Sequence, residues 1–176
     1  MRTGLKDTDD VKRPAALPNL FRACCVYLTA VLIGNLIWEV LQLPFYTIWH
    51  TGTLWQQAFA VVHCVAGDLL IAATALGVAL ITVGHRDWPS VSFTRVAVVA
   101  TAIGLGYTVF SEQLNVSARH TWAYSELMPL VSLGGLSIGL SPLLQWSIIP
   151  VLSLVLARRR IRLWHASNAP SQLEQP

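Results

Sequence analysis

Four side chains able to form hydrogen bonds recur at helical spacing inside a stretch that is otherwise apolar. This first stripe consists of Asn35, Trp38, Glu39 and Gln42, which follow the i, i+3, i+4, i+7 pattern of one helix face. A carboxyl group in hydrocarbon costs several kcal/mol unless it is paired, protonated or hydrated. A carboxylic acid buried in such surroundings stays protonated near neutrality. Glu39 is therefore a candidate proton donor.

Further ionisable residues interrupt two other apolar stretches. Thr108, Glu112 and Asn115 form a second stripe at helical spacing, while His63 and Asp68 lie together on a third segment. Five residues separate these last two, which turns their side chains roughly 140° apart on a helix. We therefore expect Asp68 and His63 to compete for the innermost direction of one shared polar pocket.

These patterns predict one polar intramembrane pocket that faces the outer side of the membrane. The ionisable candidates for catalysis are Glu39, Asp68, Glu112 and His63. The polar and aromatic candidates for substrate binding are Asn35, Trp38, Gln42, Asn115, Trp122, Tyr124, Gln145 and Trp146. The alternative is that the amides and hydroxyls only bind helices together, as such groups often do in membranes.

Acid–base chemistry on a lipid-soluble substrate would use these residue types. A protonated carboxyl can donate a proton, a second carboxylate or His63 can accept one, and aromatic faces such as Trp38 and Trp146 stabilise a developing cation. Isoprenoid isomerisation or cyclisation needs these components. A proton-coupled small-solute transporter and an accessory subunit of a membrane complex are the alternatives.

Metal catalysis is disfavoured by the spacing of the candidate ligands. Glu39, His63, Asp68, Glu112 and His120 are suitable ligand types. However, the sequence has no Glu-x-x-His or His-x-x-x-His pair in these segments to fix two ligands on one helix face. We expect no metal and no cofactor.

One local motif resembles a known family. Residues 34–39, Gly-Asn-Leu-Ile-Trp-Glu, resemble the Asn-x-x-Trp-Glu motif of the small integral-membrane terpene cyclases. The resemblance implies that Glu39 is the proton donor, but it covers one helix, and those cyclases have more spans and a second acidic residue not placed here. The chain as a whole resembles uncharacterised small four-span proteins of the bacterial inner membrane.

The segments that must position the site have the length and apolar composition of membrane spans. Hydrophobic residues make up 54 % of the chain and charged ones 12 %, and a span needs about 20 mainly apolar residues. Four segments qualify, at about 23–43, 58–83, 96–114 and 141–157. Proline and glycines break the apolar stretch 127–140, which we interpret as a short re-entrant or interfacial segment. The predicted fold is all-α, a polytopic four-transmembrane-helix bundle.

The distribution of Lys and Arg predicts the orientation. These residues precede the first span, flank the second loop and follow the fourth span, whereas the first loop has none. Both termini are therefore expected in the cytoplasm of a bacterial inner (plasma) membrane protein. We expect Trp88 at the inner interface and Tyr46 at the outer one.

This orientation divides the chain into a cytoplasmic segment 1–22, a transmembrane domain 23–157 and a basic, then disordered, tail 158–176. The expected partners are membrane lipid and a hydrophobic small molecule. A homo-oligomer or a larger membrane partner stays open, and nucleic acid is not expected because the charge of +3 is small and localised at helix ends.

Reporter fusions test the orientation. Fusions at Trp49, Trp88, Trp122 and the C-terminus should report outside, inside, outside and inside, since Lys and Arg favour the cytoplasmic side. An external C-terminus would contradict the topology.

Overall fold

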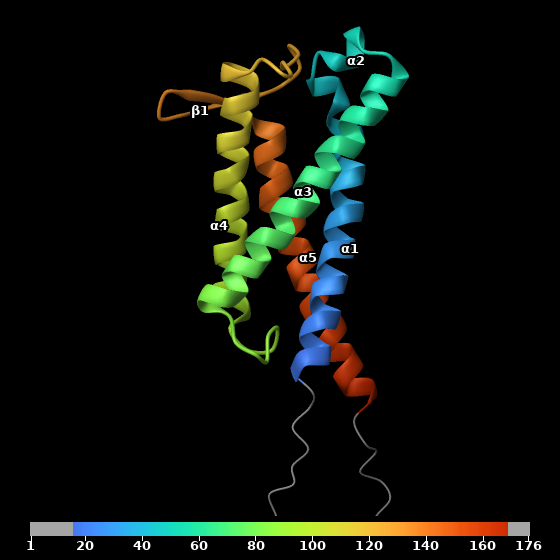
Figure 1. Ribbon diagram of the computed structural model, residues 1–176, viewed down its shortest axis with the longest axis vertical. Helices are drawn as coiled ribbons and strands as arrows, with labels where there is room; N and C mark the ends of the chain where they lie inside the picture. The colour runs from blue at the N-terminus through green and yellow to red at the C-terminus, as the bar shows by residue number, and fades with distance from the viewer. Residues whose placement is uncertain (1–15, 169–176) are drawn as a thin grey trace, which may run out of the picture.

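A computed structural model describes residues 16–168, and these form a bundle of four long helices (Figure 1). The helices are α1 (Ala16–Gln42), α3 (Leu54–Val83), α4 (Phe93–Glu112) and α5 (Leu140–Ser167). Each is long and apolar enough to cross a membrane. The chain is therefore a multi-pass membrane protein with a four-transmembrane-helix bundle, as predicted. Residues 1–15 of the predicted N-terminal segment and 169–176 of the tail lie outside the described residues.

The four helices pack in a ring. α1 contacts α5 and α3, and α4 contacts α3 and α5. Figure 1 shows α3 running obliquely: it meets α4 near the loop that joins them and leans away from α4 toward the other end of the bundle. One end of the bundle is therefore tightly closed, and α3 and α4 diverge toward the other.

The predicted re-entrant or interfacial segment is a β-hairpin. Strands β1 (Leu130–Leu133) and β2 (Leu136–Gly139) pair antiparallel, with Leu133 opposite Leu136. Gly134 and Gly135 connect them with φ values of 56° and 86°. Two consecutive positive φ values define the tight hairpin turn that glycine favours. The glycines that argue against a fifth span thus form this turn.

Three short elements complete the fold. η1 (Leu43–Phe45) and α2 (Ile48–Thr51) connect α1 to α3, and the π-helical η2 (Gln113–Ala118) extends α4. The side chain of Thr53 accepts a hydrogen bond from the backbone N–H of Gln56, and the Gln56 side chain accepts from the Thr53 N–H. This capping box fixes where α3 begins.

The helices extend beyond the predicted apolar spans. α1 begins at Ala16, and α5 continues through the arginines at 158–160 as far as Ser167. Where α1 and α5 meet, the Arg22 guanidinium lies 4.2 Å from the centre of the Trp164 ring. This cation–π contact stabilises two helix ends whose basic residues suit the membrane surface.

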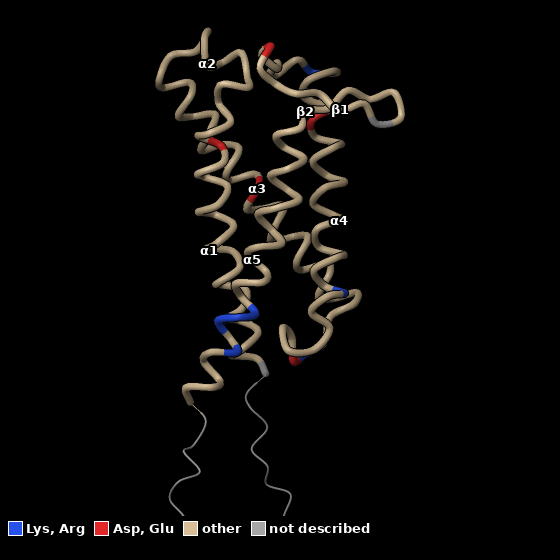
Figure 2. Tube along the Cα trace, turned by 180° about the vertical axis from the view of Figure 1, so that it is seen from behind, with Lys and Arg blue, Asp and Glu red and all other residues tan. Residues whose placement is uncertain are grey.

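The two ends of the bundle differ in charge. All described arginines except Arg119 lie at the end where the described chain begins and finishes, together with the α3–α4 loop. Figure 2 shows this end, which we call the basic end. The opposite end carries α2, the β-hairpin and the loop 119–129, and we call it the hairpin end.

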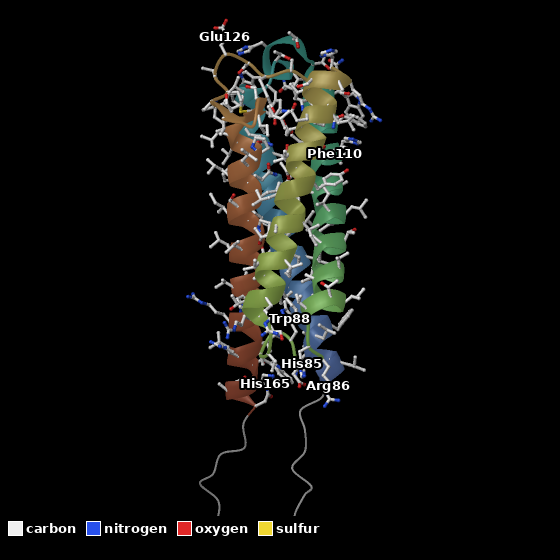
Figure 3. All side chains as sticks on the ribbon, turned by 90° about the vertical axis from the view of Figure 1, so that its left-hand side faces the viewer. His85, Arg86, Trp88, Phe110, Glu126 and His165 are labelled. Carbon is white, nitrogen blue, oxygen red and sulfur yellow. The ribbon has the colours of Figure 1, made fainter. Side chains whose placement is uncertain are left out.

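The half of the bundle toward the basic end is filled by a tight apolar core. Its residues combine large side chains with alanines, among them Ala23, Ala72, Ala79 and Ala157, all fully buried. Trp88, which Figure 3 labels at the basic end, is also fully buried. Its ring packs with this core because the α3–α4 loop folds against the helices. This half has the close packing of a protein interior.

A glycine pair on α4 tests this packing. A Cβ at Gly104 would overlap the ring of Trp146, whereas one at Gly106 would meet nothing within 4 Å. We expect Gly104→Ala to lower the free energy of unfolding by about 1–3 kcal/mol through overpacking, and Gly106→Ala to preserve it. Unfolding of both variants in mixed detergent micelles measures the difference. Equal stability would contradict the close α4–α5 approach.

Candidate functional site

A cavity of about 980 Å³ lies in the hairpin half of the bundle, and all four long helices line it. Glu39 of α1, Asp68 of α3 and Glu112 of α4 all face this cavity. His63, Gln42, Asn115, Trp122, Gln145 and Trp146 line it as well. Three carboxyl groups from three helices therefore share one space, as the helical spacing predicts.

Glu39 and Asp68 are joined through one amide of α5. The Nε2 atom of Gln145 lies 2.9 Å from Oε1 of Glu39, 3.0 Å from Oδ2 of Asp68 and 3.1 Å from Oδ1 of Asn35. An amide nitrogen carries two hydrogens, so three acceptors share two donors. The two carboxyl groups are thereby held as close neighbours.

A chain of hydrogen bonds between α1 and α5 orients that amide. Trp38 Nε1 donates to Ser141 Oγ over 3.1 Å, and Ser141 Oγ donates to Gln42 Oε1 over 2.8 Å. Gln42 Nε2 then donates to Gln145 Oε1 over 3.3 Å. Because this series ends on the Oε1 atom of Gln145, the N–H groups of the same amide point toward the carboxyls. The polar stripe of α1 thus faces α5.

Trp146 forms the floor of the cavity. Its Nε1 atom donates to Oδ1 of Asp68 over 3.2 Å, and its ring packs against Gly104. Beyond this ring lies the apolar core that fills the half toward the basic end. The cavity is therefore blind at Trp146.

Glu112 is held from the hairpin end. The Tyr124 hydroxyl donates to Oε2 of Glu112 and accepts a hydrogen bond from the Gly139 N–H over 3.1 Å. Burial raises the pKa of Tyr46, and burial with the Glu112 hydrogen bond raises that of Tyr124. Both phenols therefore stay protonated at neutral pH, and Tyr124 stays a donor to Glu112.

The loop that contains Tyr124 also forms the roof of the cavity, where it pairs with the segment after α1. The Thr47 N–H donates to the Ala123 carbonyl and the Ser125 N–H donates to the Phe45 carbonyl, each over 2.9 Å. The Tyr46 and Tyr124 rings lie 5.6 Å apart between these bonds. Tyr46 lines the cavity as part of this roof.

Among residues 16–168, no basic side chain forms an ion pair with these three acids. Within residues 16–168, the one ion pair is His85 with Asp87, 3.4 Å apart at the basic end. Arg119 lines the cavity from the roof loop. In the same part of the chain, His, Cys, Asp and Glu side chains form no cluster of three that would hold a metal ion.

The predicted site residues fall into two groups. Most line the cavity, but Asn35, Trp38 and Tyr124 lie behind it, bonded to Gln145, Ser141 and Glu112. Asp68 takes the inward direction, while His63 lies on the exposed side of α3, stacked on Phe59 with ring centres 5.8 Å apart. The cavity is wide enough to include both.

Several lining residues were not in the predicted set. Among them are Tyr46, Cys64, Gly67, Thr108 and Arg119. Cys64 and Gly67 follow from the helical spacing of Asp68 and His63, since each lies one turn away. The roof residues Tyr46 and Arg119 had no such signal, because their places depend on how two loops pair.

Comparisons with protein-family models, curated proteins and solved structures give no match to this chain. The functional argument therefore rests on the geometry of the cavity.

Replacing the shared amide tests its role. Gln145→Met keeps the side-chain length but removes the donors that Glu39, Asp68 and Asn35 share. We expect a loss of about 2 kcal/mol in the free energy of unfolding, because the side-chain oxygens of Glu39 and Asn35 stay buried without this donor. The control is Ser147→Ala, since this exposed hydroxyl bonds only to Leu143 of its own helix. If both variants unfold at the same denaturant concentration in micelles, the network does not hold the bundle together.

Proposed function

We propose that this protein is an acid–base enzyme that acts on a lipid-soluble, isoprenoid-like substrate. The observation that carries the proposal is the presence of Glu39, Asp68 and Glu112 in one blind cavity without a basic ion-pair partner among the described residues. Carboxyls held this way within a membrane mark functional sites more often than structural ones. The cavity volume falls within the range of small-molecule sites.

The hydrogen bonds favour different roles for the two carboxyls joined by Gln145. Asp68 accepts from both Gln145 and Trp146, and these donors stabilise a carboxylate. Glu39 shares only the Gln145 amide. In the proposed cycle Glu39 protonates the substrate and Asp68 removes a proton from another carbon. The Trp146 ring faces the cation formed between these steps. The proton then returns between the two neighbouring carboxyls.

The packing of the other half argues for an enzyme over a transporter. A proton-coupled carrier needs a route past Trp146 to the basic end, and there the fully buried Trp88 and small alanines fill the bundle. A carrier would have to open this tightly packed core in each cycle. An enzyme needs only the existing cavity.

We also propose the membrane in which the protein lies and its orientation there. The lysines and arginines at the chain ends and in the α3–α4 loop favour a bacterial inner membrane with both termini in the cytoplasm. In that orientation the acidic cavity lies in the outer half of the bilayer.

Glu39→Gln tests the proposed acid. The amide preserves size and hydrogen bonding but cannot donate an acidic proton. In the source organism, with the chromosomal copy replaced, we expect the lipid product to fall at least about 100-fold, since general acids contribute on that scale. Mass spectrometry of membrane lipid extracts measures it.

The matched control is Glu126→Gln, the same change at an exposed acid that points away from the bundle (Figure 3). It should leave the lipid profile unchanged. A Glu39→Gln protein that is present at normal levels and gives the wild-type profile would contradict the enzyme and favour an accessory subunit.

A further inference from the structure

The side of the cavity between α3 and α4 carries exposed aromatic residues. Trp55 and Phe59 of α3 are 79 % and 63 % exposed, and Tyr107 of α4 is 48 % exposed, yet all three line the cavity. His63 and Gly67 lie on the same exposed side of α3. In a membrane protein such side chains face lipid, so the cavity wall is continuous with the bilayer here.

Protein segments cover other parts of the cavity. The paired segments 44–47 and 123–125 roof it, Trp146 floors it, and the bonds from Trp38 to Gln145 join α1 to α5. The divergence of α3 from α4 in Figure 1 lies on another side. The exposed lining residues Phe59 and Tyr107 lie on α3 and α4, so the side between these helices is one at which the cavity meets the hydrocarbon.

The charged residues that line the cavity determine which head groups can enter it. Three carboxyls surround the interior, and the lining arginine, Arg119, belongs to the roof loop. An anionic head group would be repelled by any ionised member of the cluster. An uncharged hydroxyl or carbonyl can instead hydrogen-bond to Glu39 and Asp68. The apolar, aromatic rim suits an alkyl or prenyl chain.

Resting on the proposed function, we propose that the gap between α3 and α4 is a lateral entrance for a single-chain amphiphile with an uncharged polar head. The head reaches Glu39 and Asp68, and the chain passes Phe59 and Tyr107 into the bilayer. The substrate is thus taken from the membrane and not from the aqueous phase.

Gly67 offers a way to block this entrance. It lines the cavity, and a Cβ there meets nothing within 4 Å, so a larger side chain would extend into open space. Gly77 on the same helix also has open space but does not line the cavity. Replacing either glycine within a helix favours helix formation. Gly67→Phe and Gly77→Phe are therefore matched variants.

The test uses a long-chain alcohol with a photoreactive diazirine in mid-chain, added to full-length protein in phosphatidylcholine nanodiscs. Mass spectrometry should locate labelling on α3 and α4 near Phe59 and Tyr107. Gly67→Phe should reduce it about tenfold, while Gly77→Phe should not. The corresponding alkyl phosphate should label these sites about tenfold less than the alcohol.

Several results would overturn the proposal: equal labelling of Gly67→Phe and Gly77→Phe, labelling confined to α1 and α5, or a phosphate probe as effective as the alcohol. Glu39→Gln separates this proposal from the enzyme, because it removes the acid but leaves the entrance intact. Site-specific labelling that persists in Glu39→Gln supports the entrance whether or not that variant keeps its activity.

Discussion

Placing carboxyl groups inside a membrane is the constraint on which this structure depends. Each costs several kcal/mol unless it is protonated or given partners, and this bundle has three in one half. Gln145 supplies partners to two of them through a single nitrogen, 2.9 Å from Glu39 and 3.0 Å from Asp68. Because these acids lie on α1 and α3 while Gln145 lies on α5, satisfying them also fixes how three helices pack.

The two halves of the bundle have different structural roles: one is packed, and the other contains the cavity. Toward the basic end, alanines and the buried Trp88 bring the helices together. Toward the hairpin end, α3 leans away from α4, and polar side chains line the space that opens. Trp146 is the boundary, since its ring packs against Gly104 while its N–H bonds Asp68. A rigid half thus supports an open half, as a site held on a fixed framework requires.

Helical spacing predicted much of the site. The stripe of Asn35, Glu39 and Gln42 faces α5, and the four spans follow from apolar runs long enough to cross a bilayer. These features are local, because each depends on residues within one helix. Spacing also assigned Asp68 and His63 to different directions, although it could not indicate that a wide cavity includes both.

Features that depend on distant segments were not predictable in the same way. Tyr46 lines the cavity because residues 44–47 pair with 123–125, and no local pattern specifies that pairing. The hairpin was expected only as a break between spans. The burial of Trp88 likewise depends on how its loop folds against the helices.

The protonation of the carboxyl cluster is the most direct test of this account. Infrared spectroscopy of the protein in lipid bilayers at neutral pH detects the C=O stretch of protonated carboxyl groups, which carboxylates lack. The account predicts a protonated-carboxyl band in the wild type that weakens in Glu39→Gln. A wild-type spectrum without that band, or one that Glu39→Gln leaves unchanged, would contradict it.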